Sequence, residues 1–417
     1  SRFGPKHKWG SFPSVAVSWN MAEEAFMENA KGMVNNFRFK LGYGIAGNQN
    51  IPNYTYMTIY NPSISLGSTI LRNYGLYGNP DLRWEKQKQL NAGIEAGFFK
   101  DRINLLFDVF HIQNEDLLMM RSMASTSGYS NQISNVGALQ NRGVELTLNA
   151  VPVQTRDFYW DINFNISADR NKVTKLFDNM TEIYNVGGWS NNEIQREGNI
   201  FLGESLNNIY VYKFDRIVQE SDMDYVNSLQ LGSRIVKPGD ILPLDKNGDN
   251  IINDQDRYIV GKTTPDFYGG ISTNFSYKGI GLLINTKYSK GAKKISYLYE
   301  TLMSSNGNAS AHADLVNRWT PENTNTIIPR AYSDGGRFNL SETDWAVQDA
   351  SYFRISELTL YYNLPAKWLK TIYMEKIRVY FTGNNLALFS NYKGYDPDSG
   401  DWYPSSKQYV VGLNISF

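Results

Sequence analysis

The feature that most constrains this chain is a strict alternation of apolar and polar residues over long segments. In Phe37–Ile45, one set of alternate positions holds Phe, Phe, Leu, Tyr and Ile, and the other holds Arg, Lys, Gly and Gly. Successive side chains of a strand point to opposite faces, whereas a helix repeats about every 3.6 residues, so the pattern predicts a two-faced strand. Similar alternation, rougher in three segments, predicts about eleven strands: Phe12–Asn20, Phe37–Ile45, Gln89–Phe98, Ile103–Asn114, Gly143–Ala150, Phe158–Ser167, Gly270–Tyr277, Ile280–Tyr288, Tyr352–Leu364, Ile377–Thr382 and Tyr409–Phe417.

The composition of the two faces indicates what surrounds these strands. One face is almost wholly apolar, and the other carries Gly, Ser, Asn and Thr with scattered charges. Most segments are close to the roughly nine to eleven residues that a tilted strand needs to cross a bilayer. Lipid on one side and a wet lumen on the other explain both observations. The predicted fold class is therefore all-β, a transmembrane antiparallel β-barrel, with a soluble β-sandwich as the alternative.

The connections between the predicted strands alternate in length. Bacterial barrels have short periplasmic turns and long extracellular loops, which is the order expected here. The short joins are Lys100–Arg102, Val151–Asp157 and Lys278–Gly279, with brief helical turns predicted at Met21–Asn35, where Ala22, Phe26 and Ala30 share a face, and at Pro365–Lys376. The long loops are Ala46–Lys88, Glu115–Arg142, Ala168–Asp266, which contains a predicted hairpin at Ile209–Phe214, Ser289–Ser351 and Ser390–Gln408.

An odd number of strands has a consequence for the extent of the barrel. With Phe417 on the short-turn side, an odd count places the start of the chain on the long-loop side. Complete bacterial barrels usually have an even number of strands and both termini in the periplasm. We therefore expect residues 1–417 to be the C-terminal part of one larger barrel, because an open edge in lipid would leave backbone groups unsatisfied.

Composition narrows the possible functions. The 41 Lys and Arg balance the 41 Asp and Glu, which gives no basic field for nucleic acid. The absence of Cys excludes a disulfide scaffold, a zinc ribbon and thiol catalysis. His7, His111 and His312 have no adjacent nucleophile motif, so no enzyme is predicted. Two alternatives stay open: an outer-membrane β-barrel enzyme and a secreted soluble β-sandwich adhesin.

Several motifs occur in a fixed order along the chain. They are Ser1-Arg-Phe-Gly4, Trp9–Trp19, Asn141-Arg-Gly-Val-Glu-Leu146, Asp245-Lys-Asn-Gly-Asp249, Ser351-Tyr-Phe-Arg-Ile-Ser-Glu-Leu358 and Gly394-Tyr-Asp-Pro397. With this set the chain resembles the SusC/RagA family of TonB-dependent outer-membrane transporters, and the resemblance covers essentially all of it.

The resemblance implies a barrel of about 22 strands with a plug in its lumen. The plug and the N-terminal strands are not part of this chain. It also implies the outer membrane of a Gram-negative, Bacteroidetes-like bacterium, a SusD-like surface lipoprotein as a lid, and energy from the TonB complex. The implied function is import of oligosaccharides or oligopeptides, with outer-membrane lipid and the remaining half of the barrel as further partners.

One loop has the spacing of a calcium site. Oxygen-bearing side chains stand at positions 1, 3, 5, 9 and 12 of a twelve-residue segment, and the carbonyl of position 7 completes the set of an EF-hand-like loop. Asn replaces the usual Gly at position 6, and Asp replaces the usual Glu at position 12. An Asx-turn-rich loop held by its own backbone is the alternative. The predicted Ca²⁺ ligands are Asp245, Asn247, Asp249, Ile251, Asn253 and Asp256.

Polar and aromatic residues near the long loops are candidates for substrate binding. Trp189, Trp402 and Tyr403 could stack on sugar rings or peptide side chains, as could Trp319 and Trp345, although such residues also pack loop clusters. Asn384 and Asn385 follow the predicted strand Ile377–Thr382 at its outer end and could bind a polar ligand or cap the strand. Charged residues on the polar faces, Arg38, Lys40, Glu95 and Glu145, are expected to contact the plug or water.

Overall fold

A computed structural model describes residues 2–65, 68–73, 76–177, 179–183, 199–304, 310–331, 336–369, 373–401 and 403–417. The chain falls into two compact units, which are described separately below. Unit 1 consists of Ser1–Thr147, Asp169–Ile183 and Phe201–Ser205. Unit 2 consists of Leu148–Ala168, Tyr184–Ile200 and Leu206–Phe417.

Within the described residues, eleven long strands form one sheet in the order β1-β2-β6-β7-β10-β11-β18-β19-β22-β23-β24. Their bounds are β1 Ser14–Asn20, β2 Val34–Asn48, β6 Glu85–Phe98, β7 Ile103–Glu115, β10 Ala138–Gln154, β11 Phe158–Lys175, β18 Phe267–Tyr277, β19 Ile280–Lys290, β22 Tyr352–Asn363, β23 Lys376–Ser390 and β24 Gln408–Ser416. Each of the eleven predicted strands is therefore confirmed. Several continue further toward the long loops than the alternation predicted, most clearly β11 and β23.

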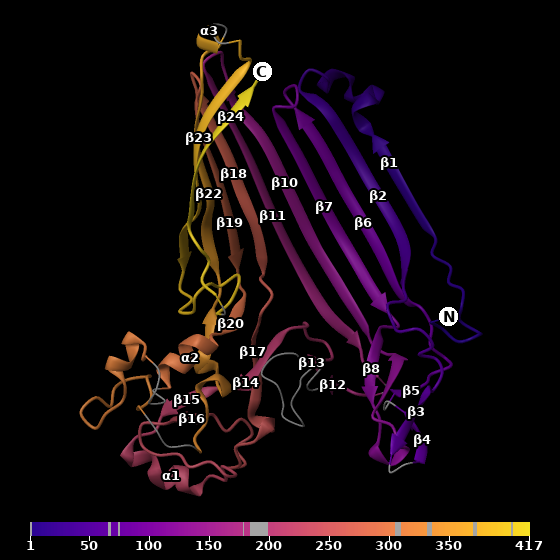
Figure 1. The fold of residues 1–417 in the computed structure, drawn as a ribbon, viewed down its shortest axis with the longest axis vertical. Coiled ribbons are helices and arrows are strands. Elements are labelled where there is room, and N and C mark those ends of the chain that lie inside the picture. Colours follow the sequence, from indigo (N-terminus) through magenta and orange to yellow (C-terminus); the bar gives the residue numbers. More distant parts are fainter. Residues whose placement is uncertain are drawn as a thin grey trace. The chain divides into compact units, whose positions relative to one another are not determined.

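In unit 1, β1, β2, β6 and β7 lie side by side as antiparallel neighbours (Figure 1). Tyr43 of β2 stands opposite Val15 of β1 and Leu90 of β6, and Leu90 stands opposite His111 of β7. This row belongs to the face predicted to be apolar, which we call the apolar face. The opposite, polar face carries Gly42 and its alternate neighbours. The observed register thus keeps the predicted faces in phase across four strands.

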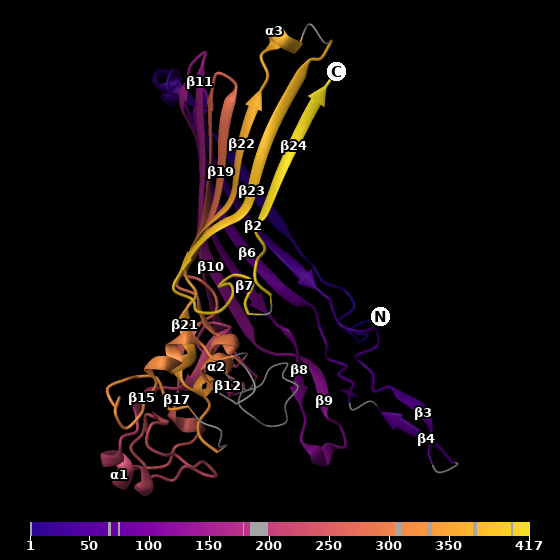
Figure 2. The same ribbon diagram turned by 60° about the vertical axis from the view of Figure 1, so that its left-hand side comes forward.

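In unit 2, β18, β19, β22, β23 and β24 are antiparallel neighbours, and β22 to β24 lie side by side in both Figure 1 and Figure 2. On the polar face, tyrosine rings cover glycines of the facing strand. Gly281 is paired with Tyr361, and Gly412 with Tyr380. A Cβ added to Gly281 would lie 2.0 Å from the Tyr361 ring. A tyrosine that shields a bare glycine backbone in this way stabilises strand pairing.

The short joins follow the predicted plan with two differences. Lys278 and Gly279 form a tight turn with φ of 46° and 92°, the positive values that a two-residue hairpin requires. The segment after β1 is not an α-turn but two 3₁₀ helices, Met21–Glu23 and Ala25–Ala30. Because such helices have about three residues per turn, the predicted shared face does not form. Ala22 is buried, whereas Phe26 is 65% exposed. The second join contains the α-helix α3, Ala366–Leu369, and the strand before the middle join runs on to Gln154.

The long loops contain smaller elements. The strands pair as β3 with β4, β9 with both β5 and β8, β12 with β13, β14 with β17, β15 with β16, and β20 with β21. Their bounds are β3 Tyr60–Ser65, β4 Ser68–Asn73, β5 Leu76–Tyr77, β8 Leu118–Ser122, β9 Asn131–Asn135, β12 Glu182–Ile183, β13 Ile200–Phe201, β14 Asn208–Tyr212, β15 Phe214–Ile217, β16 Ile241–Pro243, β17 Arg257–Lys262, β20 Lys293–Ile295 and β21 Val347–Asp349. The helices are α1 Met223–Ser228 and α2 Tyr297–Met303, with 3₁₀ turns at Ser125–Ser127, Glu220–Asp222, Asp254–Asp256, Ala313–Asn317, Leu340–Glu342 and Asp344–Ala346. The segment predicted as a hairpin, Ile209–Phe214, lies outside the large sheet as expected, but its residues belong to β14 and β15, which pair with other strands.

Two loops of unit 2 share one hydrophobic core, which we call the loop core. Val211 and Ile241 come from the segment between β11 and β18. Met303, Phe338 and Leu340 come from the segment between β19 and β22, and all five side chains are almost completely buried. Figure 1 shows α1, α2 and β14 to β17 gathered in this part of unit 2. Burial on this scale gives both loops a fixed shape.

No helix in the described ranges is long and apolar enough to cross a membrane.

Candidate functional site

Small residues hollow out the polar face of unit 1 toward the loop end of its strands. Gly42 and Gly44 of β2 have no side chains, and their β1 partners are Ala16 and Ser14. A hollow of about 390 Å³ lies along these residues. A Cβ added to Gly44 would lie 3.3 Å from the Cβ of Ser14, so larger side chains would occupy this space.

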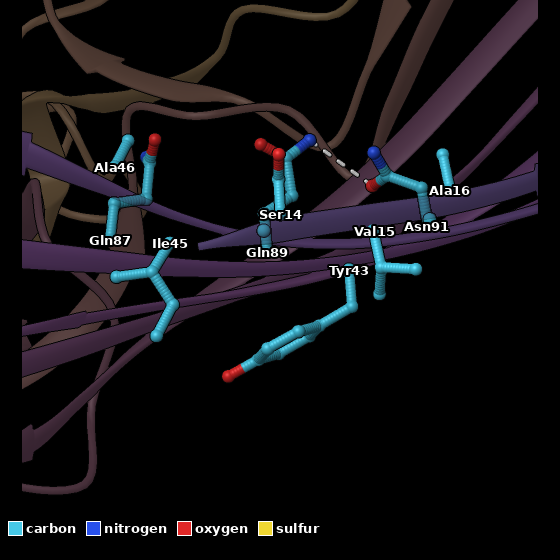
Figure 3. A pocket seen from close by; sticks show the side chains of 11 residues that line it. Ser14, Val15, Ala16, Tyr43, Ile45, Ala46, Gln87, Gln89 and Asn91 are labelled. Atoms are coloured by element: carbon cyan, nitrogen blue, oxygen red, sulfur yellow. Dashed lines mark hydrogen bonds between the residues drawn. The ribbon is translucent and has the colours of Figure 1, made fainter. Parts of the chain in front are cut away.

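Carboxamide side chains form the opposite wall of the hollow. Gln87, Gln89 and Asn91 of β6 occupy alternate positions, and Gln89 Nε2 donates a hydrogen bond to Asn91 Oδ1 at 3.1 Å. Figure 3 shows these three side chains on the same side of the sheet as Ser14, while Tyr43 points to the other side. Each carboxamide offers donors and an acceptor without a net charge. This row was not predicted as a site, although its period of two is visible in the sequence.

The charged residues predicted for the polar face of unit 1 pair with one another. Arg38 Nη1 lies 3.6 Å from Glu95 Oε2, and Lys40 Nζ contacts Glu95 Oε1. Arg38 and Glu95 are also direct cross-strand partners of β2 and β6. Their positive and negative charges therefore offset one another on this face. Glu145 of β10 is exposed.

The polar face of unit 2 carries a hydrogen-bond network across neighbouring strands. Asn274 Nδ2 donates to Asp161 Oδ2 at 2.9 Å and Asn274 Oδ1 accepts from the Tyr361 hydroxyl at 3.0 Å. In a second group, Glu357 accepts from Asn285 Nδ2 at 2.9 Å and from the Thr359 hydroxyl at 2.8 Å. Hydroxyl and amide groups in such rows fix the side chains while leaving a polar surface.

Asn384 and Asn385 lie inside β23, not at its outer end as predicted. Asn384 is paired with Glu357 of β22 and Gln408 of β24. Asn385 has φ of 52° where the register of β23 against β22 shifts, and its Nδ2 donates to the Ser406 carbonyl at 3.1 Å. The strand continues to Ser390 because this bulge absorbs the extra residue and pairing then resumes. The capping role is therefore wrong, and ligand binding by either asparagine stays a prediction.

A buried ion pair joins two of the sequence motifs. Arg354 Nη2 lies 2.6 and 2.8 Å from the carboxylate oxygens of Asp396, and the two side chains are only 8% and 2% exposed. The Ser405 hydroxyl and the backbone N–H of Asp398 also donate to this carboxylate, at 2.5 and 2.8 Å. Burial alone would raise the pKa of Asp396, but the hydrogen bonds from Arg354, Ser405 and the Asp398 backbone outweigh it and lower the pKa to about 2. The motifs around Arg354 and Asp396 therefore fasten the last long loop to β22.

A second buried charge lies beside the loop core. The Asp240 carboxylate is completely buried and contacts Arg330 Nε at 2.9 Å and Arg337 Nη1 at 3.2 Å. None of these three residues was predicted as a site residue. The two arginines lie 90 and 97 positions after Asp240 in the chain, and no local pattern connects them to it.

The aromatic candidates have different environments. Tyr403 is 78% exposed, and ligand stacking by it stays a prediction. Trp189 and Trp402 lie outside the described residues. Trp319 is buried in the loop core, and its Nε1 donates a hydrogen bond to Gln219 Oε1 at 3.0 Å. The ring of Trp345 stacks on that of Tyr299, with 5.8 Å between the ring centroids. These last two tryptophans therefore pack the loops, which was the alternative reading of them.

The predicted calcium loop is closed by its own backbone hydrogen bonds. Asp245 accepts from the N–H groups of Gly248 and Asn250, and Asp249 accepts from that of Ile251. Asn250 has φ of 62°, the conformation for which Gly stands at position 6 of such loops. Within the described residues, no three His, Asp or Glu side chains are grouped to hold a metal ion. Ca²⁺ binding by this loop stays a prediction.

A sheet of long antiparallel strands with one apolar and one polar face is the wall of a transmembrane β-barrel. Residues 1–386 match the family model described as TonB dependent receptor-like, beta-barrel. The chain therefore belongs to the TonB-dependent receptor β-barrel family.

Individual relatives agree with the SusC/RagA resemblance. TonB-dependent receptor P3 of Formosa agariphila is 32% identical over all of this chain and 43% of its own length. TonB-dependent receptor SusC of Bacteroides thetaiotaomicron is 28% identical over all of this chain and 41% of its own length. A structure of the RagAB peptide transporter matches with a TM-score of 0.81 and 25% identity, over all of this chain and 44% of the matched chain.

These comparisons confirm the predicted family and fold class. The relatives are named as receptors and transporters, which agrees with the prediction that the chain is not an enzyme. The chain spans less than half the length of the relatives it matches.

Proposed function

We propose that this chain forms part of the wall of an outer-membrane importer for oligomeric nutrients, energised by the TonB complex and working with a SusD-like surface lipoprotein. The observation that carries the proposal is the two-faced sheet, whose apolar face suits lipid and whose polar face suits a wet lumen. Membership of the TonB-dependent receptor family supports the energy source. A plug from another part of the protein would move to release the ligand to the periplasm.

The chemistry of the polar face supports a polar, oligomeric ligand. The hollow of unit 1 presents the carboxamides of Gln87, Gln89 and Asn91, and Glu95 offsets one of the two positive charges of Arg38 and Lys40. Carboxamides exchange hydrogen bonds with sugar hydroxyls and with peptide groups alike. The proposal therefore covers oligosaccharides and oligopeptides. Likeness to a structure of a peptide transporter supports the second class.

The experiment is ligand uptake by cells that carry the full-length protein. Gly42→Leu would fit into the hollow and fill it, because a Cβ at Gly42 would have the Cβ of Ala16 as its nearest neighbour, at 3.9 Å. Ala92→Leu is the matched control, since Ala92 lies on the apolar face opposite Leu41. We expect lower uptake for Gly42→Leu and unchanged uptake for Ala92→Leu. Equal uptake by both variants would show that the hollow does not contribute to transport.

Two further measurements test the class of protein and ligand. Mass spectrometry of material that copurifies with the full-length protein separates oligosaccharide from oligopeptide. Hydrolysis of lipid or glycan by the purified protein would favour the enzyme alternative, and solubility without detergent would favour the adhesin.

A further inference from the structure

Basic residues continue the apolar face of unit 1 at the loop end of its strands. On β6, the apolar positions Phe98, Ala96, Ile94, Ala92 and Leu90 are followed on the same face by Lys88 and Lys86. The register confirms this placement, because Lys88 pairs with Ile45 of β2 and Lys86 with Gly47. Both lysines therefore point away from the polar face.

On the neighbouring strands β7 and β10, the residues of the same face also change from apolar to polar or basic toward the loop end. On β7, Val109 is followed by His111 and Gln113, which stand opposite Leu90 and Lys88. Gln140 Nε2 of β10 lies 3.4 Å from His111 Nδ1, which places Gln140 on this face. Arg142 is the next residue of β10 on this face by strand alternation, and it lies two positions from Gln140 toward the short-turn end.

Strand β11 extends the same feature. Its apolar positions Ile162, Phe164 and Ile166 are followed at the same alternation by Arg170 and Lys172. We call the five side chains Lys86, Lys88, Arg142, Arg170 and Lys172 the basic band. Among the described residues at these positions of the four strands, Glu115 is the one carboxylate, and it pairs with Lys88 at 2.6 Å. Lys86, Arg142 and Lys172 have no salt-bridge partner in the described part of the chain.

The position of the basic band along the strands corresponds to the headgroup level of a membrane. From Phe98 to Leu90 the strand advances by eight residue steps, which is about 26 Å of strand and about 20 Å of membrane thickness at a tilt of about 40°. This matches the apolar band of outer-membrane barrels, which is about 25 Å tall. Lys88 is the next outward-facing residue and therefore lies at the interface on the side of the long loops.

A ligand at this interface meets two kinds of surface at once. Leu90, Val109 and Val144 are exposed apolar side chains that adjoin the basic band on the same face. An anionic headgroup would satisfy the cations, with Arg able to bind a phosphate through two nitrogens, and acyl chains would cover the apolar side chains. A soluble acidic protein would cover only the first surface. The combination fits a phosphorylated amphiphile.

We propose that the basic band binds the phosphate groups of a phosphorylated glycolipid in the outer leaflet, with its acyl chains over Leu90, Val109 and Val144. This inference rests on the proposed function, because it requires that the sheet lies in the outer membrane with its long loops outside. It assigns a role to the face of the wall that does not meet the imported ligand.

The test uses the full-length protein reconstituted into nanodiscs of phosphatidylethanolamine, with a small fraction of either diphosphorylated lipid A or phosphatidylglycerol. Lipid bound to the protein is measured by native mass spectrometry after release. The variant removes three charges, Lys86→Gln/Lys88→Gln/Arg142→Gln. The matched control removes two lysines and one arginine at the short-turn end, Lys100→Gln/Arg102→Gln/Lys278→Gln.

We expect the wild type and the control to retain lipid A and the band variant to bind it roughly a hundredfold more weakly, since each cation removed near an anionic surface weakens binding about fivefold. A charge-conserving variant, Lys86→Arg/Lys88→Arg/Arg142→Lys, should bind as the wild type does, which separates a loss of charge from a loss of fold.

Equal retention of lipid A by the band variant and the wild type would overturn the inference, as would an equal loss in the control. Preference for phosphatidylglycerol over lipid A would also overturn it, in favour of a glycerophospholipid. Failure of every variant to enter nanodiscs would instead refute the proposed function, so the two failures are distinguishable.

Discussion

Removing the charge of Asp396 should free the last long loop from the wall. In the structure, this carboxylate accepts two hydrogen bonds from Arg354 and one from Ser405, and both members of the ion pair are almost completely buried. Asp396→Asn keeps the shape and one acceptor oxygen but leaves the Arg354 charge without its partner. Breaking a buried pair in this way costs about 3–5 kcal/mol, and the retained oxygen argues for the lower end of that range.

Hydrogen exchange of the full-length protein measures this cost locally. A loss of about 3 kcal/mol corresponds to roughly a hundredfold faster exchange of the protected backbone amides in residues 391–401. Asp116→Asn is the matched control, because Asp116 Oδ1 pairs with Arg83 Nη2 at 2.7 Å but the arginine side chain is half exposed. Such a pair contributes about 1 kcal/mol or less, so exchange should change fivefold or less. An effect of Asp396→Asn no larger than that of the control would refute the reasoning.

Three other predictions follow from the structure. The folded pKa of Asp396 lies at about 2, below its ordinary 3.8, so its stabilising contribution is complete above pH 3.8 and is lost as the pH falls toward 2; hydrogen exchange of the same loop against pH checks this. If the predicted calcium loop binds Ca²⁺, calorimetry should show a heat of binding that Asp245→Ala and Asp249→Ala abolish. Identical heats in the wild type and the variants would refute Ca²⁺ binding by this loop. Gly281→Val should destabilise the folded wall by about 1–3 kcal/mol, because the added Cβ would meet the ring of Tyr361. Gly32→Val is the control, since a Cβ at Gly32 has open space around it. The two variants are compared by the temperature at which each loses its compact form on a denaturing gel.

The wall of this protein was predictable because its two faces meet different solvents. In β2 the contrast between Phe39 and Lys40 persists over the whole predicted segment, so a period of two is visible without any alignment. The ends of the strands were not predictable, because this contrast between alternate positions is lost there. In β11, residues 168–175 show little contrast between alternate positions, although the strand continues to Lys175 and Val173 is buried.

The candidate site shows where local patterns carry no information. The pairing of Arg354 with Asp396, and of Asp240 with Arg330, joins residues from separate loops, and only the folded chain brings them together. The bulge at Asn385 was also not predictable from the local sequence, because a positive φ inside a strand depends on the facing strands and not on the neighbouring residues. The carboxamide row of β6 was visible in the sequence, but the hollow that it lines depends on glycines of the next strand.

The shared loop core has a consequence for the thermodynamics of ligand capture. Because Val211 and Phe338 belong to different loops yet pack into one core, neither loop can open without exposing apolar surface of the other. The conformational entropy of both loops is therefore lost when the protein folds and not when a ligand arrives. Surface residues carried by this core would be preorganised, so a larger part of each contact that they make would appear as affinity.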